Sequence, residues 1–461
     1  MKITVKNFGA IKEGTLDLSK KLNIFCGPNG TGKTYMAYMI YGLLKSQIHF
    51  GQDIELAQNL IENRKITYPI NIKDVNKYRT ALIENFKNEF DSLFGISPEL
   101  AKLYFDSTEI LYSENENEYL ELLIKSEFKT TISIRKLEVE VTKTADTNYL
   151  ELEISEKTMS NKDIDLIEFF LYSSILSLLA SYPISSTYIS PVERNSIFTF
   201  SKELSINKQE AVDHFHAMTA KTKIDKFELL FKKTTRYPLP IKDGLMIADD
   251  LGEIKKNTGK FFEFANQIEH ELLKGKVQIT SDGEIQFKPE KAQKRSLPIH
   301  MTASIVKSLS SLVVYLKHIA QENDLIIIDE PEINLHPDNQ IILTRLFARL
   351  INKGFRIMIS THSDYVVREL NNLIMLSSNK KSIQDLKEKF SYGEDEFINK
   401  KDISVHYFNY PQKLRGNKQV NLVSIEVDDS GFEIPSVGLA IENQNEISEE
   451  LYYRLNYDEN E

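Results

Sequence analysis

Apolar and polar residues follow two different patterns within the first 45 positions. Short alternating runs predict strands, and the compact run Leu22–Cys26 predicts a buried strand. The glycine-rich segment 27–32 interrupts this run. From Lys33 onward, apolar residues recur at helical spacing, at Met36, Ala37, Ile40 and Leu43. The chain therefore begins with strands, a glycine-rich loop and a helix.

Later segments predict one α/β domain that is interrupted twice. Strands at 325–328 and 356–359 alternate with helical stretches, as in a parallel sheet. The expected division is an N-terminal part of the main domain at 1–45, an insertion lobe of helices and strands at 46–185, a strand returning to the main sheet at 186–200, a lysine-rich insertion at 201–276, and the C-terminal part of the main domain at 277–461.

The loop at 27–34 reads GPNGTGKT and matches the phosphate-binding pattern G-x-x-x-x-G-K-[ST] in full. Glycines allow backbone N–H groups to turn inward around phosphates, and the following helix directs its positive end at them. Lys33 would reach the β- and γ-phosphates, and the Thr34 hydroxyl would ligate Mg²⁺. We therefore predict binding of ATP with Mg²⁺. The candidate nucleotide-binding residues of the loop are Gly27, Asn29, Gly30, Thr31, Gly32, Lys33 and Thr34.

Two later strands end in polar groups. The apolar run 325–328 leads into Asp329 and Glu330, at the edge where α/β sheets present ligand-handling side chains. Asp329 is the candidate magnesium ligand together with Thr34, and Glu330 the candidate catalytic group that polarises water. The strand 357–359 ends in His362, 32 residues after Glu330 (362 − 330). A histidine there would contact the γ-phosphate and respond to hydrolysis.

Together these segments resemble ABC-type ATPases, and more narrowly the overcoming-lysogenization-defect (OLD)-like branch of the AAA family. The stretch EPEINLHP at 330–337 and the strand end STHS at 360–363 carry the narrower resemblance. It implies an α/β P-loop NTPase fold of the ABC-ATPase head type, with a mixed central sheet and a helical and β insertion lobe. It also implies a homodimer of heads with two ATP molecules between them, or a larger assembly of such dimers.

In such heads the partner contributes a signature serine at the start of a helix. Ser304 is the candidate, 25 residues before Asp329 (329 − 304). No glycine follows Ser304, in contrast to the fuller family pattern, so Ser308 and Ser310 remain alternatives. The segment SPVER at 190–194 resembles a loop that couples the nucleotide to the inserted lobe. The alternative is a solvated turn with an internal ion pair.

The resemblance further implies a role in antiphage defence, with the ATPase holding and releasing a separate nuclease or toxin. Only 99 residues follow His362 (461 − 362), and they contain no strand-borne glutamate followed by an Asp-x-Asp pair. We therefore expect the effector to be another chain. The alternative function is a DNA-repair ATPase of the SMC or RecF type that acts directly on DNA.

Composition narrows the range of partners. The chain of 461 residues carries 57 Lys and Arg against 67 Asp and Glu, a net charge of −10. This balance weighs against a surface built to coat nucleic acid, although lysines interleaved with aromatic residues at 221–237 leave direct binding open. The single cysteine excludes a disulfide scaffold. No apolar run reaches the roughly 18–20 residues of a membrane span, so we expect no membrane contact. The start, MKITVKNFGA, lacks the apolar core of a secretory signal, so we expect a cytoplasmic protein.

Overall fold

The computed structural model describes most of the chain. The described residues are 1–48, 50, 56–134, 137–154, 164–199, 237–291, 295–410 and 419–457. The lysine-rich stretch 201–236, with all but the last residue of the lysine and aromatic cluster, lies outside them.

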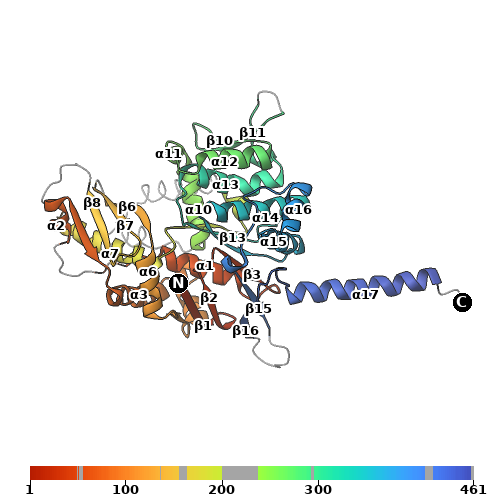
Figure 1. Ribbon diagram of the computed structural model, residues 1–461, viewed down its shortest axis with the longest axis horizontal. Coiled ribbons are helices and arrows are strands. Elements are labelled where there is room, and N and C mark those ends of the chain that lie inside the picture. Colours follow the sequence, from red (N-terminus) through yellow and green to blue (C-terminus); the bar gives the residue numbers. More distant parts are fainter. Residues whose placement is uncertain are drawn as a thin grey trace, which may run out of the picture.

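A nine-stranded sheet forms the centre of the head (Figure 1). Its strands lie in the order β5 (Glu109–Tyr112), β1 (Lys2–Phe8), β2 (Ile11–Asp17), β16 (Val420–Ile425), β15 (Ile403–Asn409), β3 (Leu22–Cys26), β14 (Arg356–Ser360), β13 (Leu325–Asp329) and β9 (Thr187–Ser190). From β15 to β9 all neighbours are parallel, whereas β5, β1 and β2 are antiparallel. The predicted mixed sheet, with its strands drawn from the start, middle and last third of the chain, is confirmed.

The central strands are apolar on both faces because helices cover both faces. In β13, Leu325 and Ile327 belong to one core, whereas Ile326 and Ile328 belong to the other. The first core packs against α1 (Lys33–Lys45). The second packs against α12 (Phe262–Ile268), α13 (Ser304–His318), α14 (Pro337–Asn352) and α15 (Asp364–Met375). Alternation of side chains across each strand thus divides one apolar run between two cores.

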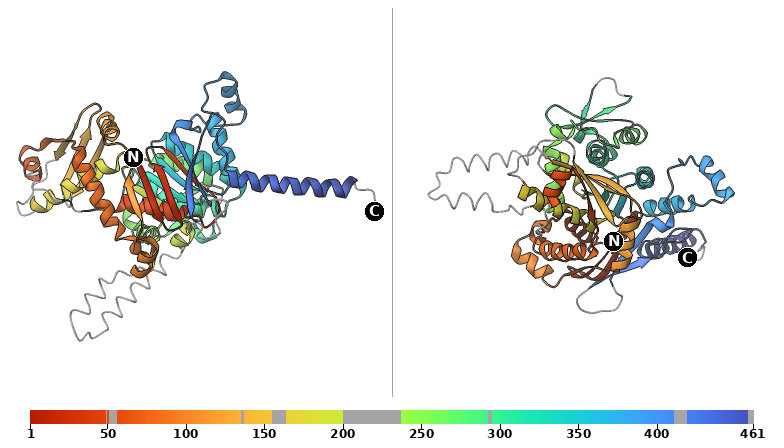
Figure 2. Two further views of the ribbon diagram at one scale, coloured as in Figure 1. Left: turned by 90° about the horizontal axis from the view of Figure 1, so that it is seen from below. Right: turned by 60° about the vertical axis from the view of Figure 1, so that its left-hand side comes forward.

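The segment 56–181 builds a lobe beside the head (Figure 2). A second sheet contains β4 (Lys65–Pro69), β8 (Tyr149–Ile154), β7 (Leu137–Lys143) and β6 (Phe128–Ile134). Its helices are α2 (Leu56–Asn63), α3 (Ile72–Lys87), α4 (Phe90–Phe94), α5 (Pro98–Phe105), α6 (Glu116–Lys125) and α7 (Ile164–Ser181). The same segment contributes β5, whose Tyr112 pairs with Ile3 of β1. The lobe and the first face of the head share one continuous apolar core.

The remaining elements are a small sheet and several short helices, together with a long helix near the end of the chain. A small antiparallel sheet contains β10 (Gly275–Ile279), β11 (Ile285–Pro289) and β12 (Leu297–Pro298). The remaining helical elements are α10 (Leu239–Asp249), α11 (Leu251–Ile254), η2 (Glu269–Leu273), η3 (Ile299–Met301), α16 (Lys381–Lys389), η4 (Lys400–Asp402) and α17 (Pro435–Tyr457). None of the described helices is both long and apolar enough to cross a membrane.

One buried arginine joins the lobe to the edge of the head sheet. Arg79 of α3 places Nη1 2.8 Å from Oε1 of Glu114, and both side chains are buried. Its Nε and Nη2 donate to the Ala180 carbonyl at 3.1 and 2.8 Å. The guanidinium lies between the rings of Tyr112 and Tyr119, 4.2 and 3.8 Å from their centroids. The arginine therefore ties three helical segments of the lobe to β5.

Replacing Arg79 with methionine should lower the free energy of unfolding by about 3–5 kcal/mol, because Glu114 would remain buried without its partner. Urea unfolding followed by circular dichroism measures the change. The control is Lys129→Met, which removes a pair with Glu140 whose side chains are both exposed and should have little effect. Equal midpoints for the two variants would contradict a structural role for the buried pair.

Candidate functional site

The loop between β3 and α1 has the backbone of a phosphate cradle. Gly27, Gly30 and Gly32 have φ angles of +131°, +74° and +95°, which favour glycine. A Cβ at Gly27 would lie 2.2 Å from the Phe408 carbonyl oxygen, so only glycine fits there. Gly32 precedes α1 without any side chain capping the helix. The N–H groups of the first helical turn therefore stay available for an anion.

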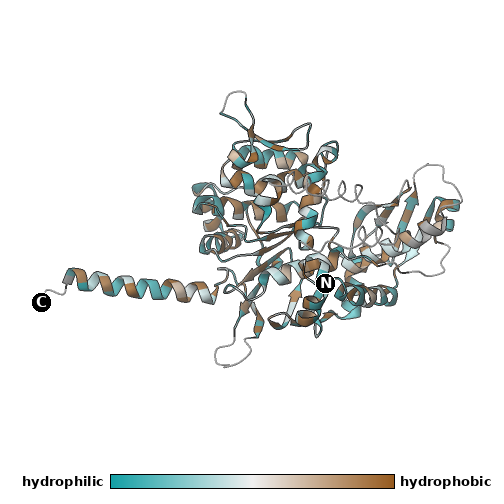
Figure 3. Cartoon of the chain, turned by 180° about the vertical axis from the view of Figure 1, so that it is seen from behind, coloured by the Kyte–Doolittle hydropathy of each residue, from teal (hydrophilic) through white to brown (hydrophobic). Residues whose placement is uncertain are grey.

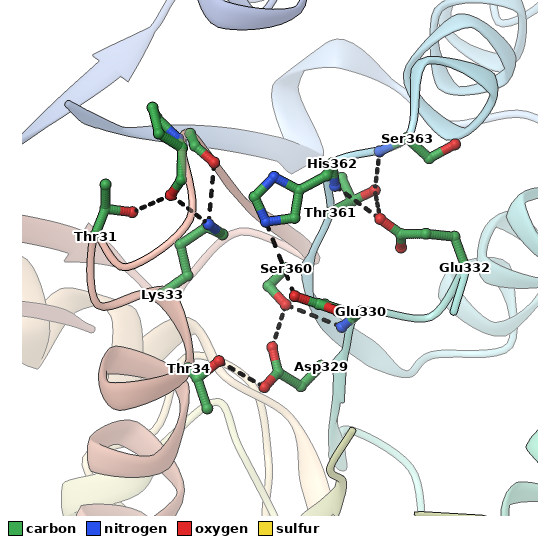
Figure 4. Close-up of polar contacts among 12 residues, drawn as sticks. Thr31, Lys33, Thr34, Asp329, Glu330, Glu332, Ser360, Thr361, His362 and Ser363 are labelled. Atoms are coloured by element: carbon green, nitrogen blue, oxygen red, sulfur yellow. Dashed lines mark hydrogen bonds and ion pairs between the residues drawn. The ribbon is translucent and has the colours of Figure 1, made fainter. Parts of the chain in front are cut away.

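Lys33 lies inside this loop (Figure 4). Its Nζ donates to the carbonyl oxygens of Gly27 at 3.0 Å and Pro28 at 2.9 Å. Thr31 donates its hydroxyl to the same Pro28 oxygen at 2.8 Å. Burial lowers the pKa of Lys33, while nearby carboxylates, Glu330 foremost, oppose that change. The two carbonyl oxygens therefore hold the ammonium group against the backbone of the loop. Asn29 and Gly30 are exposed at its tip.

The candidate metal ligands meet across the ends of two strands. Thr34 donates its hydroxyl to Oδ2 of Asp329 at 2.8 Å, and the Ser360 hydroxyl contacts Oδ1 of the same carboxylate. Asp329 and Ser360 are aligned neighbours on β13 and β14. A hydroxyl and a carboxylate are the hard oxygen ligands that suit Mg²⁺. The donor set therefore fits magnesium completed by phosphate oxygens and water.

Glu330 has an unusual backbone, with φ at +46°, a region that side chains rarely adopt. Its N–H donates to the Ser360 hydroxyl at 3.0 Å. Its carbonyl accepts from Nη2 of Arg194 at 2.8 Å, and Nη1 of Arg194 donates to the Asp329 carbonyl at 2.8 Å. Such a conformation costs about 1–3 kcal/mol and persists because neighbours hold it. These contacts fix the direction in which the Glu330 side chain leaves the strand.

Arg194 rules out one of the two interpretations of the segment at 190–194. The arginine is only 3% exposed, and its guanidinium binds backbone carbonyls, including that of Pro191. The solvated turn with an internal ion pair is therefore wrong. The sequence gives no signal for this burial, because the contact of Arg194 with the end of β13 depends on the order of strands in the sheet.

His362 faces Glu330 across the site, with 3.9 Å between Nε2 and Oε1. Glu332 anchors the histidine segment, since its Oε1 accepts from the Thr361 hydroxyl at 2.8 Å and from the His362 N–H at 2.7 Å. Burial, followed by the charge of Lys33, lowers the pKa of His362 below its usual 6.5. Both effects favour the neutral imidazole. The sequence analysis assigned no role to Glu332, although it lies only two residues after Glu330.

Ser304 is exposed as the first residue of α13. It lines a pocket whose lining includes neither Lys33 nor Thr34. The other residues of that pocket are Asn195, Ser196, Thr199, His300, Lys307 and Asn334. Ser308 and Ser310 are buried within α13, so neither can meet a nucleotide on a partner. Ser304 is the remaining candidate for a serine that acts on a partner's nucleotide.

Removing the Lys33 charge should raise the pKa of His362, because that charge disfavours the protonated imidazole. NMR titration of the histidine ring signals in Lys33→Met measures the change, with His362→Gln used to assign the signal. In the parent protein this histidine should titrate below pH 6.5, so its neutral form is lost only as the pH falls past that value. Lys256→Met, an exposed and distant change, is the control. An unchanged pKa in Lys33→Met would contradict the electrostatic coupling.

Curated proteins with similar sequences include the DNA replication and repair protein RecF from two strains of Streptococcus pneumoniae, CGSP14 and ATCC 700669. Each is 30% identical over 95 residues, which cover 18% of this chain and 26% of the relative. The chain thus spans about a quarter of the length of the curated relatives it matches.

Solved structures with a similar arrangement include the SMC head domain from Thermotoga maritima, at 12% identity and a TM-score of 0.32, covering 92% of this chain and 98% of that one. A Smc head domain with an extended coiled coil, bound to the C-terminal domain of ScpA derived from Pyrococcus furiosus, has 13% identity and a TM-score of 0.36, covering 97% and 98%.

The family is identified by a match over most of the chain. The model of the AAA ATPase domain matches residues 1–367, which include the phosphate loop, Asp329, Glu330 and His362. The chain therefore belongs to the AAA ATPase domain family.

Proposed function

We propose that two copies of this chain close on two ATP molecules with Mg²⁺, hydrolyse them and reopen. The observation that carries the proposal is the convergence of Lys33, Thr34, Asp329, Glu330 and His362 on one sheet edge. Glu330 and His362 are each about one-third exposed, so this side of the site faces outward. A second head would close the site by presenting Ser304 from its own α13.

Each group has a distinct proposed task. Loop N–H groups and Lys33 hold the phosphates, while Thr34 and Asp329 hold Mg²⁺. The metal supplies charge neutralisation at the phosphates when it is bound. Glu330 orients the attacking water. Neutral His362 contacts the γ-phosphate and registers its departure.

The proposed output is a change in the geometry of the head dimer, transmitted to a separate effector protein. Net negative charge supports a protein partner over extensive DNA contact. A role in antiphage defence, with a nuclease or toxin as effector, rests on the OLD-like resemblance of the segments at 330–337 and 360–363.

A second candidate function is direct action on DNA. The shared segment with RecF, a DNA replication and repair protein, favours it. Measuring ATP turnover of the full chain with and without duplex DNA distinguishes direct action on DNA from control of a protein effector. DNA that accelerates turnover and binds with strong salt dependence favours direct action. Turnover indifferent to DNA favours control of a protein effector.

Glu330→Gln should bind ATP normally but slow its turnover by about 10²–10⁴-fold, because the amide no longer accepts a proton from water. Phosphate release and binding of a fluorescent ATP analogue measure the two steps. Glu388→Gln, an exposed change on α16, is the matched control. Hydrolysis at the parent rate in Glu330→Gln would refute the assignment of this carboxylate.

A mixing experiment tests whether Ser304 acts on the partner's nucleotide. Ser304→Arg keeps the phosphate loop but loses the serine, and Lys33→Ala keeps the serine but loses the loop lysine. Each variant alone should therefore lose most ATP turnover, because every site lacks one of the two groups. In a dimer of one copy of each variant, one site combines the intact phosphate loop of the Ser304→Arg chain with the intact serine of the Lys33→Ala chain. Co-expressed subunits should therefore regain part of the lost ATP turnover. Ser382→Arg, an exposed serine near the start of α16, is the control. No recovery in the mixed dimer would argue against action across subunits.

A further inference from the structure

The chain ends in a helix that projects away from the head. Helix α17 has 23 residues, about 34 Å at 1.5 Å per residue. No other described element lies along its outer part in Figure 1 or in the left-hand view of Figure 2. Figure 3 colours hydrophobic residues brown, and these recur along α17. Ile447, Leu451 and Leu455 are 52%, 57% and 84% exposed. A helix of this kind leaves apolar area in water that a partner would cover.

Residues of α17 at alternating steps of four and three form a seam along one side. The seam residues are Val437, Ile441, Gln444, Ser448, Leu451 and Leu455. This spacing is that of the contact positions in a coiled coil. Four glutamates of α17 fall outside the seam, at Glu442, Glu446, Glu449 and Glu450. Two such helices can therefore meet along their seams without opposing carboxylates.

From either end of the seam, two apolar residues are followed by two polar residues and then by two apolar residues. When two copies run antiparallel, Ile441 opposes the partner's Leu451 and Val437 opposes the partner's Leu455. Gln444 then opposes the partner's Ser448, so the two polar positions pair with each other in the middle. A twofold axis requires this kind of self-complementarity. We propose that α17 pairs antiparallel with α17 of a second copy and holds the protein as a dimer without nucleotide.

The base of α17 offers a place for the end of the partner helix. A groove there has apolar walls from Val367, Phe432, Ile434, Val437 and Ile441. Its acidic lining residues are Asp364, Glu433 and Glu442, while Arg368 is the basic one and pairs with Asp364. In the antiparallel arrangement the partner's Leu455 reaches this groove. The partner's Arg454, the one basic residue of α17, arrives beside the acidic rim.

This contact is distinct from the ATP-dependent closing of heads. It involves no residue around Lys33 or Ser304 and persists when nucleotide leaves. Opening of the heads after hydrolysis would then leave the two chains joined, so the next closure occurs within one assembly.

The test measures the mass of the full chain in nucleotide-free buffer by sedimentation. We expect a dimer, and Leu451→Glu should raise its dissociation constant by at least about tenfold, because a buried carboxylate replaces an apolar contact. Leu439→Glu is the matched control, since Leu439 is similarly exposed, at 56%, on the opposite side of the helix. Lys33→Ala, defective in ATP binding, should remain dimeric.

Cysteine cross-linking tests the direction of pairing. Chains with Gln444→Cys mixed with chains with Ser448→Cys should form a disulfide between them, whereas Gln444→Cys alone should form little. Efficient linking of Gln444→Cys to itself would indicate parallel helices and overturn the antiparallel arrangement. A nucleotide-free monomer, or a dimer equally stable with Leu451→Glu and Leu439→Glu, would overturn the proposal whether or not the chain hydrolyses ATP.

Discussion

The register of three parallel strands determines the rest of the head. Ser360 on β14 lies level with Asp329 on β13 and with Phe25 on β3, the strand that leads into the phosphate loop. A shift of β13 by one residue would send the Asp329 carboxylate to the opposite face of the sheet. It would break the contacts with Thr34 and Ser360 together. The two apolar cores fix this register, because each takes alternate residues of the same strands.

Much of this site was predictable because its residues are adjacent in sequence to strong local signals. A buried strand followed by glycines predicts a phosphate loop. An apolar strand that ends in Asp329 and Glu330 predicts a metal-binding site at the edge of the sheet. The contacts of Arg194 were not predictable, since they depend on β9 lying beside β13. The same holds for Glu332, whose partners Thr361 and His362 lie about thirty residues away, just beyond the end of β14.

Two kinds of fold feature escaped the sequence patterns. The strand β5 lies between polar helices and becomes a strand only by pairing with β1. The sequence patterns predict no helix at 435–457, where the structure has α17. Its apolar seam is interrupted by Gln444 and Ser448, which weakens the periodic signal. For β5, the deciding contact therefore lies outside the local segment.

The position of β5 determines how the lobe can move. A lobe joined to the head by loops alone could rotate about those loops without disturbing the sheet. Here four residue pairs join β5 to β1, and Arg79 binds the lobe to Glu114, just beyond that strand. Rotation of the lobe must therefore bend the margin of the sheet or peel that strand away. Because β1 pairs with both β5 and β2, a displacement of the lobe would reach the head sheet first at β1.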